Sequence, residues 1–409
     1  MRKLTTLFFL LFLISNVSTA QEVLTLEKCL QIALDNNLQI KRAENNYLIA
    51  KSNKIGAIGA FLPSLEANIG YDYFVGTNFD QNAARQVTAT TNSSNPNLSS
   101  SWTIFNGLSN LNSYRQSQAN MKAAKFGIER DKLNTKSSVY SAYLSIILDK
   151  ENIKISEERV ELLESQLTRV EEREKVGVSN MEDVYNFRSQ LANEKLSLIN
   201  LRNTLRSDEL TLYQLLMLDL SKSYEVAPFY AEDEVLLSVA PFQDILANTL
   251  EFSPTIKAAQ YQQDASKFAF KQASGARYPT ISAFARYGSN YSSNGATNPE
   301  QPFFDPDTGE PGFNFEPNAT FFEQLGYNQF EYLGFTMNIP IFSNFSIKNG
   351  IQTARLNYRN SEIDAQQAYQ TVTNTLQQTY LGLVSAQETF KAAKENMISL
   401  EQSYQFAKK

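Results

Sequence analysis

The most constraining feature of this chain is a long internal duplication, in which each copy runs from a helical pattern through a proline into an alternating strand. The segment Leu62-Pro63-Ser64-Leu65 matches Tyr278-Pro279-Thr280-Ile281, which lies 216 residues later. Proline stops a helix because it lacks an N–H and clashes with the preceding turn. Pro63 and Pro279 are therefore predicted helix-to-strand junctions. Solenoid repeats have periods of roughly 20–50 residues, so this longer period indicates a duplicated half-molecule.

Helical spacing precedes each junction, over residues 24–62 and 241–278, and a period of two follows it. The alternation predicts strands at about 64–74, 98–106, 280–289 and 330–341. Residues 77–97 are crowded with Asn, Thr, Ser and Gln and are expected to form a loop, and a longer loop is expected to reach residue 329. Each strand is close to the roughly 9–11 residues that a tilted membrane strand needs.

The segment from about 108 to 218 predicts a long antiparallel helical hairpin. Apolar residues recur every seven positions in two rows, a repeat that keeps one stripe of a helix against a partner helix. The rows are Val139, Ile146, Ile153, Val160 and Leu167, and then Val184, Leu191, Leu198, Leu205 and Leu212. A turn between the rows would place Leu167 opposite Val184 and Val139 opposite Leu212. A plain coiled-coil spacer is the alternative for this segment alone.

The two ends of the chain set the expected domain boundaries. Residues 1–20 have the basic start, short apolar run and small residues of a secretory signal peptide, with an uncleaved N-terminal anchor as the alternative. The first repeat is then 21–218, the linker 219–240 and the second repeat 241–409. Lys409 corresponds to Glu172 of the first repeat, so we expect the second repeat to be C-terminally truncated and the sequence to be a fragment.

Composition argues against catalysis. The chain has no histidine, which removes the Ser-His, Cys-His and HExxH arrangements, and it has no Gly-rich phosphate loop. We expect no enzyme activity, no cofactor and no metal site. The single cysteine, Cys29, is expected to be a small buried residue on a helix. The net charge of −6 has both signs interspersed, which argues against nucleic acid as a partner.

The strands predict how the chain would enter a membrane. Beyond the N-terminus no run of about 20 apolar residues occurs, so an α-helical span is not expected. Four strands cannot close a barrel, because the smallest single-chain barrels have about eight. Open strand edges in lipid would leave backbone groups unpaired, so copies of the chain must share one barrel. Two copies would give eight strands, and three would give twelve and leave a lumen.

Alternation assigns residues to the two faces of this barrel. Polar positions suit a wet lumen, namely Glu66, Asn68, Asp72, Ser282, Arg286, Thr336 and Asn338. Aromatic positions suit lipid and the aromatic girdles of a membrane protein, namely Tyr71, Tyr73, Trp102, Tyr287 and Phe335. The alternative is that these aromatic residues form the core of a soluble sheet.

With these segments together, the chain resembles the outer membrane efflux protein (TolC-like) family. The resemblance rests on the two helix-Pro-strand units, on Ser253-Pro254-Thr255-Ile256, on Ile104-Phe105-Asn106-Gly107, and on the hairpin turn Lys175-Val176-Gly177-Val178-Ser179-Asn180-Met181-Glu182-Asp183-Val184. Asn37-Leu38 departs from the family's Asn-Pro step, which the second repeat keeps.

The resemblance implies an α+β membrane protein with duplicated helix–strand–strand–long helix halves. Four strands per chain would join a shared, trimeric 12-stranded β-barrel in the outer membrane of a Gram-negative cell. Long antiparallel coiled coils would continue it as an α-barrel into the periplasm. The resemblance also implies that Val176, Gly177, Val178 and Ser179 form a periplasmic tip that contacts an adaptor protein.

The expected function is a passive exit duct of a tripartite efflux pump or a type I secretion system. The expected partners are two further copies of the chain, outer-membrane lipid, a periplasmic adaptor and an inner-membrane pump. A periplasmic coiled-coil adaptor or structural interaction protein is the alternative, although it would not need the duplicated strands. An enzyme is the third and weakest alternative.

Overall fold

The computed structural model describes residues 22–80, 85–222, 224–229, 240–293, 302–304, 311–313 and 320–408. The expected signal peptide and residues 223 and 230–239 of the expected linker lie outside these ranges. The chain forms two compact units. Unit 1 contains the described parts of 1–47, 124–258 and 368–409, and unit 2 those of 48–123 and 259–367.

Unit 1 is built on the helical hairpin. Helix α4 (Ser109–Lys175) has 67 residues and enters unit 1 at residue 124, and α5 (Met181–Leu215) returns beside it. At a rise of 1.5 Å per residue, α4 alone is about 100 Å long. The expected pairing of the two heptad rows is visible at the base of the hairpin. There Val139 and Leu212 belong to one buried cluster, with Ile146 and Leu205 beside them.

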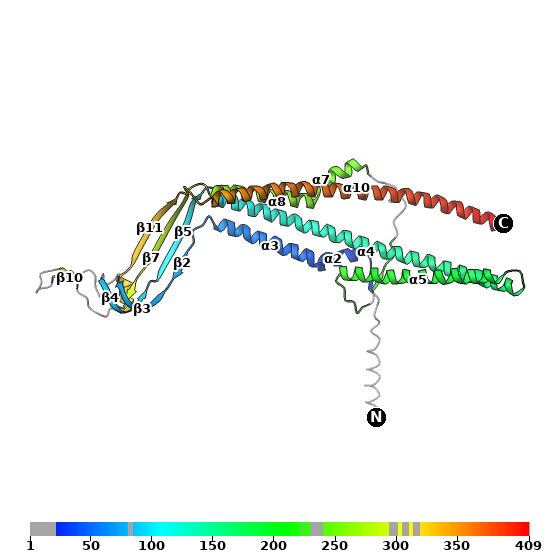
Figure 1. Cartoon of the computed structure of the whole chain (residues 1–409), viewed down its shortest axis with the longest axis horizontal. Coiled ribbons are helices and arrows are strands. Elements are labelled where there is room, and N and C mark those ends of the chain that lie inside the picture. Colours follow the sequence, from blue (N-terminus) through cyan, green and yellow to red (C-terminus); the bar gives the residue numbers. More distant parts are fainter. Residues whose placement is uncertain are drawn as a thin grey trace, which may run out of the picture. The chain divides into compact units, whose positions relative to one another are not determined.

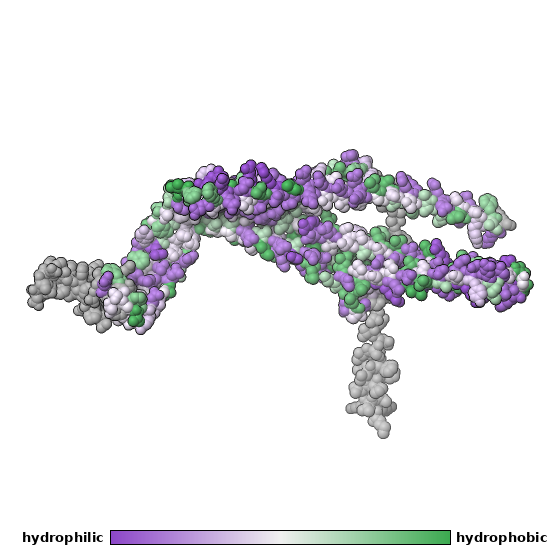
Figure 2. All heavy atoms as spheres, viewed as in Figure 1, coloured by the Kyte–Doolittle hydropathy of each residue, from purple (hydrophilic) through white to green (hydrophobic). Residues whose placement is uncertain are grey.

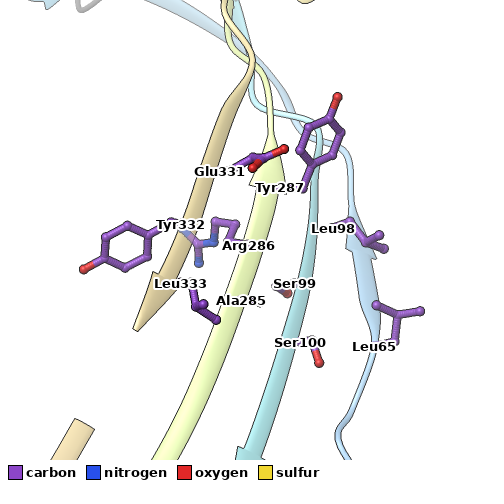
Figure 3. Close-up of a pocket in the computed structure, with 10 residues that line it drawn as sticks. All are labelled: Leu65, Leu98, Ser99, Ser100, Ala285, Arg286, Tyr287, Glu331, Tyr332 and Leu333. Carbon is purple, nitrogen blue, oxygen red and sulfur yellow. The ribbon is translucent and has the colours of Figure 1, made fainter. Parts of the chain in front are cut away.

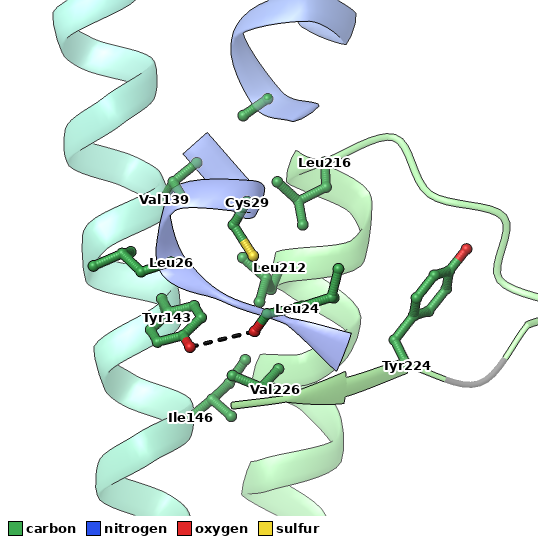
Figure 4. Close-up of a cluster of buried hydrophobic side chains, with 11 residues drawn as sticks. Leu24, Leu26, Cys29, Val139, Tyr143, Ile146, Leu212, Leu216, Tyr224 and Val226 are labelled. Carbon is green, nitrogen blue, oxygen red and sulfur yellow. Dashed lines mark hydrogen bonds between the residues drawn. The ribbon is translucent and has the colours of Figure 1, made fainter. Parts of the chain in front are cut away.

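The buried cluster of unit 1 lies where a small two-stranded sheet meets the hairpin (Figure 4). Strand β1 (Glu22–Leu24) pairs in parallel with β6 (Tyr224–Val226), and α2 (Leu26–Asn36) follows β1. Tyr143 of α4 is 1% exposed, and its hydroxyl donates to the carbonyls of Ala227 (2.7 Å) and Leu24 (3.3 Å). The Leu24 carbonyl also accepts from the N–H of Ala227 (3.0 Å), so the Tyr143 hydroxyl adds a side-chain bond between α4 and the ends of the two strands.

Cys29 lies in this cluster and is fully buried. Burial raises the pKa of the Cys29 thiol to about 11, so the thiol stays protonated and unreactive at neutral pH. The expectation of a small buried residue on a helix is confirmed.

The expected helix over 24–62 is in fact a short strand and two helices, α2 and α3 (Leu38–Gly59). Asn37 interrupts the helix, and its side-chain oxygen accepts from the N–H groups of Gln39 (2.8 Å) and Ile40 (3.2 Å). An Asn side chain that accepts these N–H groups starts a new helix. The second repeat breaks in the same place, at Ser253, between α7 (Phe242–Phe252) and α8 (Pro254–Gly275).

Unit 2 contains the main sheet, in the order β11-β7-β5-β2 (Figure 1). Its strands are β2 (Glu66–Asn68), β5 (Asn97–Asn106), β7 (Thr280–Gly288) and β11 (Phe330–Asn338), and every neighbouring pair is antiparallel. After β11 the chain enters α10 (Ser346–Lys408), which has 63 residues and belongs to unit 2 up to residue 367.

The loop expected over 77–97 is wrong, because most of it is a β-hairpin. Strand β3 (Tyr71–Asp80) pairs with β4 (Arg85–Ser94), which also contacts the short β8 (Tyr291–Ser292). Threonines face each other across the ladder, and the hydroxyls of Thr77 and Thr88 lie 2.7 Å apart. Threonine favours strands and forms such cross-strand bonds, so a segment that is polar in composition still makes a regular ladder.

The second expected loop also contains structure. Strands β9 (Pro302–Phe304) and β10 (Pro311–Phe313) pair with each other, and α9 (Phe321–Tyr327) precedes β11. A capping box of Thr320 and Glu323 begins α9. Gln324 is 2% exposed and ties α9 to β8, since its side chain bonds both the N–H and the carbonyl of Ser292.

Candidate functional site: a two-faced sheet, its junctions and a helical tip

The register of the main sheet places six of the seven expected lumen residues on one face. Thr336 pairs with Ser282, and Ser282 pairs with Thr103. Four residues further along β7, Arg286 pairs with Ser99, which pairs with Glu66. Because side chains alternate along a strand, residues in every second row share a face. The six residues on this face are Glu66, Asn68, Ser282, Arg286, Thr336 and Asn338. Their role in lining a lumen stays a prediction.

The opposite face is apolar. One row across it contains Phe335, Ala283 and Trp102, and the row at the far end contains Tyr287. Phe335 is 72% exposed and Met337 59% in the single chain. Exposed apolar area of this extent marks a surface that lipid or a partner covers. The expected lipid-facing residues Trp102, Tyr287 and Phe335 share this face, and their contact with lipid stays a prediction.

Tyr71, Asp72 and Tyr73 are not brought together with the others. They lie in β3, which belongs to the second sheet with β4 and β8, and they pair there with Ser94, Ser93 and Asn92. All three are exposed in the single chain. Their assignment to lumen or lipid therefore rests on the alternation alone and stays a prediction.

Two features of the apolar face were not predicted from the sequence. A β-bulge between Thr103 and Phe105 puts Phe105 opposite Ile281, so Ile104 is the extra residue of the strand. Glu331 pairs with Tyr287 and so falls at the end of the apolar face, beside a hollow lined also by Leu98 and Leu333 (Figure 3). Counting back by two from Leu333 would have found Glu331, whereas nothing in the sequence marks the bulge.

The first helix-to-strand junction is tied by hydrogen bonds to strand β5 and to the start of helix α4. After Pro63, the N–H of Ser64 donates to the carbonyl of Ser101 (2.9 Å). The indole of Trp102 donates to the carbonyl of Phe61 (2.9 Å), and the amide of Asn110 donates to that of Ala60 (2.8 Å). These two carbonyls follow the end of α3, where helical acceptors lack partners of their own. Pro63 and Pro279 thus lie where the sequence analysis expected them, between helix and strand.

The strand-to-helix junctions have an unusual backbone that the sequence analysis did not predict, although Asn106-Gly107 contributes to the family resemblance. Gly107 and Leu108 both have positive φ, 63° and 64°, and so do Asn344 and Phe345, 48° and 60°. Two consecutive left-handed residues turn each strand sharply into its long helix, a conformation that is unfavourable for residues other than glycine. The signal was the echo of Asn106-Gly107 by Ser343-Asn344 in the two repeats.

The helical tip is a compact turn with an exposed apolar end. Gly177 has φ of 74°, its N–H donates to the carbonyl of Glu174, and the N–H of Val178 donates to that of Arg173. This is a Schellman motif with glycine in the left-handed position. Ser179 donates to the Asp183 carboxylate (2.9 Å). Val176 and Val178 are 74% and 64% exposed, and Figure 2 shows hydrophobic atoms at the end of an otherwise mostly hydrophilic hairpin.

Three ion pairs join the outer surfaces of the hairpin's helices. They are Glu157–Arg202, Glu164–Lys195 and Glu171–Arg188, at 2.7 to 2.8 Å. Their partners advance by seven residues on both helices, which is the spacing of the apolar rows. Exposed pairs of this kind contribute only about 0.2–1 kcal/mol each, so their main effect is to favour one register of the hairpin.

One buried carboxylate in the hairpin predicts a dependence of stability on pH. Asp149 is 8% exposed, and its Oδ2 has no hydrogen-bond partner among the described residues. Burial, and then the neighbouring Asp208, raise the pKa of Asp149. A raised pKa means that the folded state favours the protonated acid, so stability falls as pH rises through that pKa. Asp149→Asn should therefore raise the melting temperature at pH 7.5, by about 2 °C.

The gain from Asp149→Asn should shrink as the pH is lowered through the raised pKa of Asp149, because the native acid is then neutral as well. Thermal unfolding of both proteins between pH 4 and 8 measures it. Glu151→Gln, which removes a neighbouring exposed carboxylate, is the control and should change little. A gain that is independent of pH would contradict the assignment.

Among the helices that the structure describes, none is both long and apolar enough to cross a membrane. The described residues contain no group of three or more side chains suited to holding a metal ion.

Solved structures show the same fold. The CmeC outer membrane channel of Campylobacter jejuni is 19% identical, with a TM-score of 0.71 over 93% of this chain and 74% of that one. CusC is 18% identical, with a TM-score of 0.69 over 90% and 79%. VceC of Vibrio cholerae is 14% identical, with a TM-score of 0.68 over 90% and 80%. No curated protein matches the sequence.

The sequence model of one family, described as "Outer membrane efflux protein", matches residues 29–216 and 245–409. These residues include both repeats and nearly the whole described chain. The match confirms the resemblance drawn from the junctions and the tip. It also confirms the expected location in the outer membrane of a Gram-negative cell, extending into the periplasm, and the expectation of a transport channel rather than an enzyme. The chain belongs to the outer membrane efflux protein family.

Proposed function

We propose that this chain forms the passive exit duct of an envelope-spanning export system, as a trimer with one shared 12-stranded β-barrel. The observation that carries the proposal is the main sheet. One of its faces carries six of the expected lumen residues together with the ring pair Phe284–Tyr332, and the other face is largely apolar. Each chain contributes the four strands of that sheet, so three chains give twelve. Twelve strands enclose a lumen, whereas the interior of about eight is filled by side chains.

The two faces then acquire distinct roles. Thr336, Ser282 and Arg286 face water in the lumen, and Phe335 and Trp102 face lipid. The aromatic residues Tyr71, Tyr73 and Tyr287 belong to the interfacial girdles, and Asp72 extends the wet face beyond the main sheet. A charge inside the lumen remains hydrated, so Arg286 and Glu66 incur little desolvation there.

The long helices carry the duct away from the membrane. Copies of the hairpin α4–α5 and of α10 would pack side by side into an α-barrel through apolar side chains that are exposed on these helices in the single chain, such as Leu144 and Leu381. Energy for transport comes from an inner-membrane pump, and the duct is passive. Whether its cargo is a small toxic compound or a secreted polypeptide distinguishes a tripartite efflux pump from a type I secretion system. A gene deletion scored for drug susceptibility and for missing secreted proteins separates the two.

The direct test of the duct is electrical. Purified full-length protein reconstituted into a planar bilayer should conduct ions in discrete steps, and it should migrate as a trimer until heated. A protein that remains monomeric and leaves the bilayer insulating would overturn the proposal.

We propose that the tip binds the periplasmic adaptor through Val176, Gly177, Val178 and Ser179. The exposed valines are rigid apolar anchors held by the Schellman turn at Gly177. Replacing both with aspartate should weaken adaptor binding by about 2 kcal/mol, or roughly 30-fold in Kd. Drug efflux or secretion by the cell should fall accordingly, while the bilayer conductance of the purified trimer should not change.

The matched control for the tip is Leu162→Asp, which places a charge on a residue of α4 that is 54% exposed and away from the turn. It should leave adaptor binding intact. Equal losses from the tip and control variants would show that charge on the hairpin, not the tip, is responsible.

A further inference from the structure

The two repeats are equivalent in strand register as well as in sequence. A residue that precedes the long loop of the first repeat has its counterpart 216 positions later in the second repeat. A residue that follows the loop has its counterpart 237 positions later. In the first repeat Glu66 pairs with Ser99, and in the second Ser282 pairs with Thr336. The two residues of the second pair are the counterparts of the two residues of the first. The pairs Ala67–Leu98 and Ala283–Phe335 are related in the same way. The offsets therefore transfer contacts from one repeat to the other.

One further contact joins the first repeat to the second. Strand β5 pairs with β7, with Ser100 opposite Ala285 and Trp102 opposite Ala283. Beyond the ends of these strands, the hydroxyl of Ser109 in α4 donates to the carbonyl of Gln272 in α8 (3.0 Å). There the backbone of Gly107 lies so close to Gly275 that a Cβ on Gly275 would be 2.6 Å from the Gly107 carbonyl oxygen.

Each of the two segments that form this contact has a counterpart in the other repeat of the same chain. By the offsets, Ser346 corresponds to Ser109, Gly59 to Gly275 and Gly56 to Gln272. Asn344 and Phe345 keep the left-handed turn of Gly107 and Leu108. Yet a Cβ built on Gly59 would meet no described atom within 4 Å. Within the described sheet, β2 pairs with β5 alone and β11 with β7 alone, so both strands have an open edge.

We propose that a second copy of this chain completes the contact, a step that rests on the proposed trimer and gives it a register. Strand β11 of one copy pairs with β2 of the next as β5 pairs with β7. Met337 then lies opposite the partner's Ile69, and Asn338 opposite the partner's Asn68. The turn at Asn344 packs against the partner's Gly59, and the Ser346 hydroxyl donates to the carbonyl of the partner's Gly56.

The chemistry of the transferred pairs supports this register independently. Apolar residues meet apolar ones, since Phe335, Met337 and Ile339 lie opposite the partner's Tyr71, Ile69 and Ala67. Polar Thr336 and Asn338 lie opposite the partner's Gly70 and Asn68. A slip by one residue would turn every side chain of one strand to the wrong face.

Disulfide cross-linking tests the register in the full-length protein, with Cys29→Ala to remove the native thiol. Cys pairs in place of Ile69 and Met337 should link neighbouring copies into a covalent trimer that survives boiling under non-reducing conditions. The pair Ile69 and Phe335 is two residues out of register, at a diagonal spacing of about 7–8 Å that exceeds the reach of a disulfide. Its yield should be severalfold lower. Cys in place of Ser100 and Ala285 should link within one chain and migrate as a monomer.

Two glycine variants test the helix contact without disturbing the single chain. A Cβ at Gly56 or Gly59 would meet no described atom of its own chain within 4 Å, and alanine favours a helix over glycine. The Gly59→Ala protein should nevertheless form little trimer. Its counterpart Gly275 lies against the backbone of Gly107, and the partner copy would bring the turn at Asn344 equally close to Gly59. Gly56→Ala should keep the trimer, because its counterpart is Gln272, which already carries a side chain.

The outcomes separate this inference from the proposed function. The proposed register is wrong if conducting trimers cross-link equally well through the out-of-register pair. It is also wrong if they tolerate Gly59→Ala as well as Gly56→Ala. Neither result contradicts the proposed duct. Absence of any trimer or conductance from the Cys29→Ala protein overturns the duct and the register together.

Discussion

Phe335→Arg should abolish insertion into the outer membrane, with little or no heat-modifiable trimer in membrane fractions. Phe335 lies in the middle of β11, in a row with Ala283 and Trp102 on the apolar face. An arginine on the lipid face of a barrel near the bilayer midplane costs about 2–4 kcal/mol. A trimer would carry this cost three times, so the change in assembled protein is expected to be large.

Thr336→Arg is the matched control, because Thr336 is the next residue of the same strand and lies on the polar face. Its arginine would enter the hydrated lumen, so the trimer should form and its conductance or ion selectivity should change. The two variants together test the assignment of faces. Loss of the trimer from Thr336→Arg with retention in Phe335→Arg would invert that assignment.

Gly107→Ala should destabilise the junction between β5 and α4 by about 2–4 kcal/mol. Two effects add at this position. The φ of 63° is unfavourable for any residue with a Cβ, and a Cβ would also collide with the backbone of Gly275, whose carbonyl carbon would be 2.9 Å away. Backbone cannot move aside as a flexible side chain can. Thermal unfolding of the purified protein measures the loss.

Gly127→Ala is the control for this substitution. Gly127 lies within helix α4, and a Cβ there would meet none of the described atoms within 4 Å. Alanine favours a helix over glycine by up to about 1 kcal/mol, so this variant should be slightly stabilised. Equal destabilisation of both variants would mean that the close approach at Gly107 is not what makes it necessary.

Much of the fold followed from local patterns. The switch from helical spacing to alternation located β7 and β11, and the heptad rows located the hairpin and paired Val139 with Leu212. These features were predictable because amphipathic periods of 2 and 3.5 are written directly in the order of residues. The roles of the lumen, lipid and tip residues remain predictions that the proposed experiments test.

The incorrect predictions concern segments whose structure depends on pairing with another strand and not on their own amino-acid composition. The segment over 77–97 looks like a loop in composition, yet Thr77 and Thr88 face each other across a regular ladder. Polar strands give no alternation of apolar residues, so only their pairing reveals them. The bulge at Ile104 is likewise a property of the match between β5 and β7, not of β5 alone.

The sequence by itself determined that the molecule has two similar halves, where each helix gives way to a strand, and which faces of the strands differ in polarity. Only the tertiary structure decided which of two equivalent glycines is enclosed. Gly59 and Gly275 occupy the same position of the repeat, but only Gly275 meets the backbone of Gly107 within its own chain. The physical reason is that periodicity is a local property of neighbouring residues, whereas close approach depends on segments that are distant along the chain.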